Sequence, residues 1–103
     1  MTAALRVTIL GSGTSSGVPR IGPDGADWGA CDPNEPRNSR RRVSLLVQHG
    51  DYNVLIDTSP DLRAQLIDAR CGRLDAVLYT HDHADHCHGI DDLRQLFYLQ
   101  NQP

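Results

Sequence analysis

The sequence predicts an α/β (α+β) fold, in which strands and helices share one small domain. Residues 5–10, 43–48 and 52–57 alternate apolar with polar side chains or concentrate β-branched residues, as strands do. Residues 62–67 carry apolar side chains at helical spacing, and an apolar run, residues 74–80, precedes a second segment of that kind. The 103 residues leave room for one domain.

The first strand ends before Gly11, and a long irregular segment follows it. Residues 11–38 hold most of the glycines and prolines and show no sustained period. We therefore expect a loop here, and loops of that length usually have a function or are disordered. The next two strands pair as a hairpin, because residues 49–51 form a short connection that contains glycine.

The hairpin leads into the first helix. Ser59 can cap the free amides, Pro60 is tolerated at the first helical position, and Asp61 is favoured by the helix dipole. Gly72 marks the expected end of this helix. The expected buried stripe consists of Leu62, Leu66 and Ile67.

The fourth strand, residues 74–80, leads directly into a cluster of histidines, so the cluster lies at a strand end. From Gly89 onward, a last helix is expected to run to residue 98 or 99, with two aspartates in its first turn. Residues 100–103 add no further element. The apolar positions at helical spacing are Ile90, Leu93, Leu96 and Phe97.

Composition narrows the range of functions. The net charge of −3 gives no overall attraction to nucleic acid or to an anionic membrane. Cys31, Cys71 and Cys87 are widely spaced and odd in number, which favours a reducing compartment. Residues 1–10 do not resemble a signal peptide, and no apolar run is long enough to span a bilayer. We therefore expect a cytoplasmic protein that binds no membrane.

Four of the five histidines lie within residues 80–88, together with two aspartates. Imidazole and carboxylate are ligands that hold zinc or manganese. In an extended segment, side chains two residues apart point the same way, so His81 and His83 can bind one ion. Asp85 and His86, in the turn that follows, can reach a second ion. The spacing predicts a two-metal site rather than a single structural one.

Such a site implies a specific chemistry. Two neighbouring ions can share a water molecule and lower its pKa to about 7, which creates a hydroxide nucleophile at neutral pH. Asp85 is therefore a candidate catalytic residue as well as a candidate ligand. His88 lies outside the pattern, and we expect it to be a hydrogen-bonded residue at a helix start. The competing interpretation of the whole cluster is a solvated polar loop.

Residues 80–94 resemble the HxHxDH region of the metallo-β-lactamase superfamily; they read Thr-His-Asp-His-Ala-Asp-His-Cys-His-Gly-Ile-Asp-Asp-Leu-Arg. Residues 10–19, together with residues 32–33 and 37–40, resemble one branch of it. This branch contains the phosphoribosyl cyclic phosphodiesterase of phosphonate breakdown (PhnP-like proteins) and, more distantly, the tRNA 3′-processing endonucleases. The resemblance extends over essentially all of the chain, and it implies two divalent metal ions, zinc or manganese, as cofactors.

The resemblance also implies that residues 1–103 form a partial domain, the N-terminal half of a metallo-β-lactamase αββα sandwich. Such a half has a mixed, mostly antiparallel sheet with helices on one face. The family's remaining ligands, a histidine, a bridging aspartate and a last histidine, lie downstream of Pro103. The inner sheet face then lacks its partner, and we expect an exposed apolar surface that associates with the missing C-terminal half or with another copy.

Individual residues can be carried over from the family. His81 and His83 correspond to the ligands of the first metal, and Asp85 and His86 correspond to those of the second. Asp57, which closes the third strand, matches the acidic residue that orients a ligand histidine, a contact that the chemistry requires in any case. The alternative is that Asp57 is only a turn or cap residue.

A glycine-rich segment with the spacing GxGxxxG follows the first strand. Neither a dinucleotide-binding nor a P-loop pattern fits, because no helix follows and Gly-Lys-Ser/Thr is absent. We expect a tight turn near the metal site, where amides bind a substrate phosphate or where glycine is needed only for the turn. The neighbouring basic run, residues 37–42, can contact phosphate or be a solvated strand entry. The candidate phosphate-binding residues are Gly13, Thr14, Ser15 and Arg40.

These features favour a metal-dependent phosphodiesterase. The expected substrate is a small cyclic or nucleotide-like phosphodiester, attacked at phosphorus by a metal-bridging hydroxide. Nucleic acid is not the favoured substrate, since no aromatic residues interleave with the basic run. We expect the chain to be inactive alone unless another chain supplies the missing half. The alternatives are a non-catalytic metal-binding or scaffold module and a thioester hydrolase of the same superfamily.

Overall fold

Four strands form the main sheet of the computed structural model, which describes residues 4–100. They are β1 (Leu5–Gly11), β4 (Ser44–His49), β5 (Tyr52–Ile56) and β6 (Ala76–Leu78), in the order β1-β4-β5-β6. The pairs β1–β4 and β4–β5 are antiparallel, whereas β6 is parallel to β5. The sheet is therefore mixed and mostly antiparallel, as predicted. The expectations for residues 1–3 and 101–103 lie outside the described residues.

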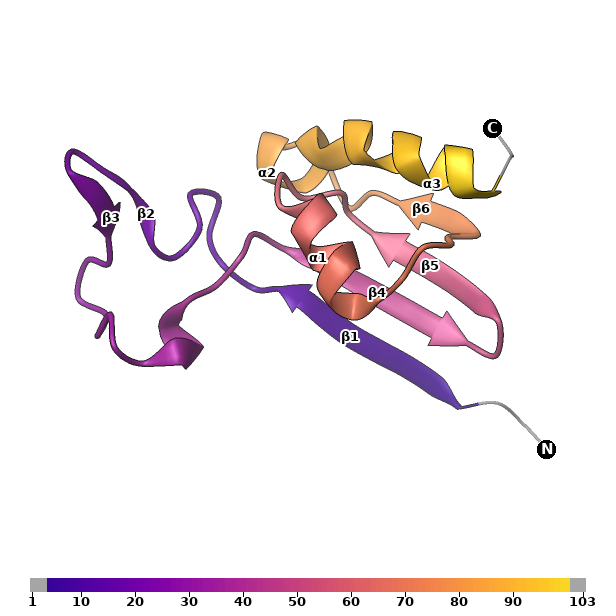
Figure 1. The fold of residues 1–103 in the computed structure, drawn as a ribbon, viewed down its shortest axis with the longest axis horizontal. Helices are drawn as coiled ribbons and strands as arrows, with labels where there is room; N and C mark the ends of the chain where they lie inside the picture. Colours follow the sequence, from indigo (N-terminus) through magenta and orange to yellow (C-terminus); the bar gives the residue numbers. More distant parts are fainter. Residues whose placement is uncertain (1–3, 101–103) are drawn as a thin grey trace.

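Helices cover one face of this sheet (Figure 1). They are α1 (Leu62–Ala69), the short helix α2 (Ala84–Cys87), the 3₁₀ helix η2 (His88–Asp92) and α3 (Leu93–Gln100). The prediction of one continuous helix from Gly89 is wrong. The Gly89 amide donates to the carbonyl of Thr58 (3.0 Å) instead of to a neighbouring turn, which interrupts the α-helical pattern. None of the helices within residues 4–100 is long and apolar enough to cross a membrane.

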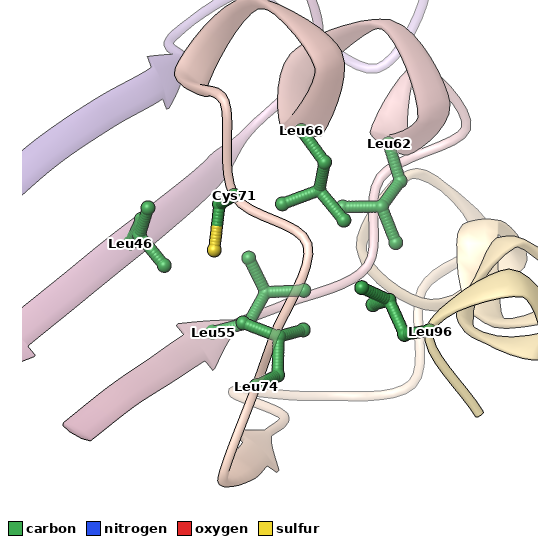
Figure 2. Close-up of a cluster of buried hydrophobic side chains, with 7 residues drawn as sticks. All are labelled: Leu46, Leu55, Leu62, Leu66, Cys71, Leu74 and Leu96. Atoms are coloured by element: carbon green, nitrogen blue, oxygen red, sulfur yellow. The ribbon is translucent and has the colours of Figure 1, made fainter. Parts of the chain in front are cut away.

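The core lies between the sheet and the helices (Figure 2). Leucines of β4 and β5 face leucines of α1 and α3, so the same cluster holds both long helices on the sheet. Cys71 is buried within it as a free thiol that packs like a small apolar side chain. The buried cluster consists of Leu46, Leu55, Leu62, Leu66, Cys71, Leu74 and Leu96.

The predicted apolar stripes of the helices are only partly buried. Ile67 was expected in the core but is 59% exposed, because it lies one position further round the helix than Leu66. In the last helical region Leu96 is buried, whereas Ile90 and Phe97 are 57% and 46% exposed. Each long helix thus packs mainly leucines on the sheet, while Ile67 of α1 and Phe97 of α3 stay at the surface.

α1 begins and ends at other residues than predicted. Its N-cap is Asp61, while the Ser59 hydroxyl accepts a hydrogen bond from Asp61 N (3.1 Å) and donates to Gln65 Oε1 (2.7 Å). The helix ends with Arg70 in the left-handed conformation, two residues before Gly72. The amide of Arg70 donates to carbonyls of the last turn, so the backbone closes the helix without a glycine.

The segment between β1 and β4 projects from the body as an arm (Figure 1). It contains the short antiparallel strands β2 (Arg20–Gly22) and β3 (Gly25–Asp27) and the 3₁₀ helix η1 (Pro36–Asn38), so the expected irregular loop is partly ordered. An ion pair between Arg20 and Asp27 (2.9 Å) joins the two strands. Strands of three residues are too short to produce a detectable period, which is why the sequence does not predict them.

The face of the sheet opposite the helices is apolar and uncovered. Strand pairing aligns Val7, Val47 and Val54 in one row across the sheet, and Ile9 begins a second row. Ile9 is 67% exposed and Leu78, at the other end of its row, is 55% exposed. This surface, called the open face below, agrees with the expected exposed apolar surface. It consists of Val7, Ile9, Leu45, Val47, Val54, Ile56 and Leu78.

Candidate metal centre

The candidate site lies where β5 and β6 end. Because these strands are parallel, their C-terminal ends meet at one edge of the sheet, and a hydrogen bond from Asp57 N to Leu78 O (2.8 Å) extends the pairing beyond β5. Asp57 follows β5, and Thr80 and His81 follow β6. The fold thereby brings together residues that are far apart in the sequence.

Asp57 is the buried acid of the site, with 1% of its surface exposed. Its Oδ1 accepts a hydrogen bond from Thr80 N (2.8 Å), and its Oδ2 accepts from Thr80 Oγ1 (2.8 Å) and from His86 Nδ1 (2.7 Å). The carboxylate therefore holds the ring of a histidine, and the assignment of that histidine as a metal ligand stays a prediction. Asp57 also has a φ of 66°, a left-handed conformation that aspartate tolerates better than most residues.

Hydrogen bonding decides the charge of Asp57. Burial alone would raise the pKa of this carboxyl group, since the ionised form loses hydration. The hydrogen bonds from His86 and Thr80 favour the ionised form and outweigh burial, so the pKa of Asp57 is lowered from its ordinary value. Because an ionised carboxylate only accepts hydrogen bonds, His86 carries its proton on Nδ1, and Nε2 is left for other contacts.

Backbone hydrogen bonds clamp the histidine segment onto residues 57–59. Thr58 N donates to His86 O (2.9 Å), and Gly89 N donates to Thr58 O (3.0 Å). Gly89 is required at this point, because a Cβ would overlap the carbonyl group of Ser59. We refer to these two hydrogen bonds as the Thr58 clamp. It fixes the backbone of α2 relative to the end of β5.

Three imidazoles lie together at this edge. The ring centroids of His81 and His83 are 4.4 Å apart, and those of His81 and His86 are 4.1 Å apart. His83 is the N-cap of α2, and Asp85, in the first turn of α2, places Oδ2 3.3 Å from His86 Nε2. The structure thus gathers all four predicted ligands in one cluster. His88 is exposed at the start of η2.

The donors of this cluster suit a divalent metal, but they do not enclose one as they stand. Within residues 4–100, no group of three or more His, Cys, Asp or Glu side chains is arranged so that it could hold an ion. The imidazoles pack against one another, with ring centroids 4.1 and 4.4 Å apart. In favour of a metal, His86 already has on Nδ1 the carboxylate partner that metal-binding histidines usually have. The residues fit a metal in type, and their assignment as ligands stays a prediction.

The predicted phosphate-binding residues lie at the same end of the sheet, but the amide of Gly13 is not free. It donates to Arg41 O (2.7 Å), so it has no N–H left for a phosphate. Glycine is needed here for close approach, because a Cβ would lie 2.7 Å from Arg40 O. This corrects the expectation for Gly13. Thr14, Ser15 and Arg40 are exposed, and their contact with phosphate stays a prediction.

Two features of the site have no counterpart in the sequence-based prediction. From the sequence, Thr80 is expected only to end a strand. Its hydroxyl group, directly before the first histidine, is the signal that could have indicated a polar contact at the site. The basic run is predicted as a unit, whereas its members have separate partners. Arg41 pairs with Asp68 (2.6 Å) and Arg42 pairs with Asp61 (2.8 Å). Asp68 lies in α1 and Asp61 lies directly before it. The sequence of the basic run alone therefore does not show that each arginine has its own acidic partner.

The fold and the site define a class of protein in which an HxHxDH segment and a buried acid meet at the strand ends of a sheet covered by helices. A family model described as a beta-lactamase superfamily domain matches residues 52–103. The match includes β5, β6 and all four candidate ligands. The chain therefore belongs to the metallo-β-lactamase superfamily, which confirms the resemblance found in the sequence.

Two curated relatives cover parts of the chain. An octanoyltransferase of Porphyromonas gingivalis is 44% identical over 93 residues, which are 89% of this chain and 18% of the relative. A ribonuclease Z of a Bradyrhizobium strain (ORS 278) is 40% identical over 60 residues, which are 56% of this chain and 20% of the relative. The chain thus spans about a fifth of the length of these relatives.

Solved structures agree with this assignment. A diphosphatase described as a new member of the PhnP family is 44% identical, with a TM-score of 0.85 over 94% of this chain and 37% of that one. Zinc-bound PqqB from Methylobacterium extorquens is 27% identical, with a TM-score of 0.61 over 94% of this chain and 34% of that one. The similarity to PhnP-family and ribonuclease Z proteins confirms the branch predicted from the sequence.

Proposed function

We propose that the protein is a metal-dependent hydrolase that cleaves a phosphodiester bond in a cyclic or nucleotide-like small molecule. The observation that carries this proposal is the hydrogen bond between Asp57 and His86 (2.7 Å), because a buried carboxylate on an imidazole is typical of a metal-binding histidine. A diphosphatase among the structural neighbours and a ribonuclease among the relatives support a substrate that contains phosphorus.

The residues of the cluster have separate roles in this proposal. His81 and His83 bind one ion, and Asp85 and His86 bind the other. When bound, two divalent ions, zinc or manganese, would lower the pKa of a water molecule and would place positive charge beside the phosphate. Asp57 keeps the Nε2 lone pair of His86 available for an ion. Asp85, whose Oδ2 lies 3.3 Å from His86 Nε2, is the acid beside the ring nitrogen that would bind the ion and is therefore the candidate catalytic residue.

The arm supplies groups for the substrate. Thr14 and Ser15 offer exposed hydroxyl donors, and Arg40 offers an exposed guanidinium group at the same end of the sheet as the histidines. Guanidinium pairs well with the oxygens of a phosphate ester, because two parallel N–H groups match two oxygens. A phosphate bound by these residues would lie at the same end of the sheet as the histidine cluster.

The first test is elemental analysis of the purified 103-residue chain for zinc and manganese, compared with His83→Ala and His49→Ala. His49 ends β4 at the opposite end of the sheet, so it is a matched control. We expect bound metal in the wild type and in His49→Ala, and a lower metal content in His83→Ala. Metal-free wild type, or equal metal content in both variants, would refute the ligand assignment.

Hydrolysis of bis-p-nitrophenyl phosphate by the same samples tests the reaction. The chain spans 37% of the diphosphatase it resembles, so we expect turnover only where the rest of the site is supplied, by the remainder of a longer protein or by a second copy. Such turnover should be lost in His83→Ala and retained in His49→Ala. Turnover that persists in His83→Ala would contradict a role for the cluster.

Two alternatives predict other outcomes. A non-catalytic metal-binding module binds metal but cleaves no ester, even within a longer protein. A thioester hydrolase cleaves an octanoyl thioester faster than bis-p-nitrophenyl phosphate. The octanoyltransferase relative is the observation that favours this second alternative, although the chain covers 18% of it. Parallel assays with both substrates separate these possibilities.

A further inference from the structure

We propose that Thr80 is a positioning residue that fixes which ring nitrogen of His81 faces the metal site. Its hydroxyl oxygen lies 2.8 Å from Asp57 Oδ2 and 2.8 Å from His81 Nδ1. Thr80 therefore connects the buried acid with the first histidine of the HxHxDH segment. The consequence for metal binding rests on the proposed function, whereas the orientation of the ring follows from the hydrogen bonds alone.

A hydroxyl group has one proton, and this decides the direction of both hydrogen bonds. The Asp57 carboxylate, which also receives N–H groups from Thr80 and His86, can only accept, so Thr80 donates its proton to Asp57. The hydroxyl oxygen then accepts from His81, which requires a proton on His81 Nδ1. Nε2 of His81 is left with its lone pair, which is the form of imidazole that binds a metal ion.

One carboxylate thereby orients two histidines from different elements. Asp57 holds His86 directly and His81 through the Thr80 hydroxyl, so both rings present Nε2, and the ring centroids are 4.1 Å apart. His81 is exposed, whereas Asp57 is 1% exposed. Without the hydroxyl, water could bind either nitrogen of His81, and nothing would select the tautomer that leaves Nε2 free. Thr80 thus extends the influence of a buried group to an exposed ring.

The test compares Thr80→Val, which keeps the side-chain shape without the hydroxyl, with Thr80→Ser, which keeps the hydroxyl. Proton–nitrogen correlation NMR of the metal-free chain, with nitrogen-15 in its histidines, reports which nitrogen of each ring is protonated. The spectra are recorded at about pH 8, above the ordinary pKa of imidazole. We expect His81 to be protonated on Nδ1 in the wild type and in Thr80→Ser, and mainly on Nε2 in Thr80→Val. His86 should stay protonated on Nδ1 throughout.

Thr58→Val is the control for general loosening of the site. It removes a buried hydroxyl that contacts Tyr79 and the carbonyl of Cys87 but none of the histidine side chains. We expect it to leave the His81 tautomer unchanged. The proposal is overturned by an unchanged His81 in Thr80→Val, by a Thr80→Ser variant that behaves like Thr80→Val, or by the same change of tautomer in Thr58→Val.

Zinc affinity, measured by calorimetric titration, provides a second readout. We expect Thr80→Val to bind zinc about 10-fold more weakly than the wild type, and Thr80→Ser to stay within about 2-fold. Equal affinities in all three proteins would refute the role of Thr80 in metal binding. If the wild type itself binds no zinc, the proposed function fails, and the NMR spectra still decide whether Thr80 sets the tautomer of His81.

Discussion

Asp61 binds Arg42 through three hydrogen bonds. Its Oδ2 accepts from the backbone N (2.9 Å) and from Nε (2.9 Å) of Arg42, and its Oδ1 accepts from Nη2 (2.8 Å). The two side chains are only 29% and 26% exposed. Gln65 adds a further contact, because its Nε2 donates to the carbonyl of Arg42 (2.8 Å). The C-terminal end of the arm, where the chain enters β4, is therefore held against the start of α1.

We expect Asp61→Asn to lower the free energy of unfolding by about 1–3 kcal/mol at neutral pH. The Arg42 guanidinium lowers the pKa of Asp61, and this outweighs the opposite effect of partial burial. Since the folded pKa lies below the unfolded one, the stabilisation is present above the unfolded pKa and is lost as the pH falls through the folded pKa. Urea unfolding at several pH values should therefore show a difference from the wild type that shrinks in acid.

Asp68→Asn is the matched control for this prediction. The ion pair of Asp68 with Arg41 is exposed, with 64% and 43% of the two side chains accessible, so water screens it. We expect a loss of less than about 1 kcal/mol. Equal losses in the two variants, or an Asp61→Asn effect that stays constant in acid, would contradict the special role of the Arg42–Asp61 pair.

Gly89→Ala should destabilise the fold beside the candidate site. The new Cβ would overlap the carbonyl of Ser59, which accepts a hydrogen bond from Leu62 N (3.0 Å) and cannot move without disturbing α1. We expect a loss of about 1–3 kcal/mol in thermal or urea unfolding. In Gly72→Ala the added Cβ meets only Leu99 Cδ1 at 3.6 Å, so a change within about 0.5 kcal/mol is expected.

Asp57→Asn tests the buried acid without disturbing the backbone, because asparagine also tolerates the left-handed conformation. An amide in place of the carboxylate removes the negative charge that orients His86. We expect zinc affinity to fall by about 10- to 100-fold in calorimetric titration. Asp24→Asn, an exposed position in the β2–β3 turn, serves as the control and should bind zinc like the wild type. Unchanged affinity in Asp57→Asn would show that the acid does not support a metal ligand.

The open face should make the isolated chain associate. Apolar side chains on an uncovered sheet of this kind are usually buried against a partner. We expect sedimentation velocity to show self-association that Ile9→Lys reduces, with little change in melting temperature, because Ile9 is 67% exposed. Ile21→Lys alters an isoleucine that is 97% exposed on the arm, away from the open face, and should leave the association unchanged. The same behaviour in both variants would contradict a role for the open face.

The sequence predicts the four strands of the main sheet and brings the four candidate ligands close together, since both signals are local. β1, β4 and β5 are long enough for alternation to show, and the four candidate ligands fall within a few residues of one another. The contact between Asp57 and His86 spans 29 residues, so only the family resemblance could indicate it. Tertiary contacts of this kind produce no periodic pattern of residues in the sequence.

Errors occur where a tertiary contact overrides a local preference. Gly89 has the apolar spacing of a helix around it, yet its amide binds Thr58 and the α-helix begins only at Leu93. Gly13 resembles a phosphate-binding glycine, yet its amide is taken by Arg41. In both cases a backbone N–H that looks free in the sequence is paired in the fold, and the pairing cannot be inferred from neighbouring residues.

The Thr58 clamp makes the histidine segment and the end of β5 one cooperative unit. Separating α2 from the sheet requires both backbone hydrogen bonds to break, together with the contact between His86 and Asp57. The Thr58 and Gly89 amides should therefore exchange their hydrogens with solvent in the same local opening event, at the same free energy. On heating, the candidate ligands would not loosen one by one; their geometry would persist until this unit opens and then be lost in a single step.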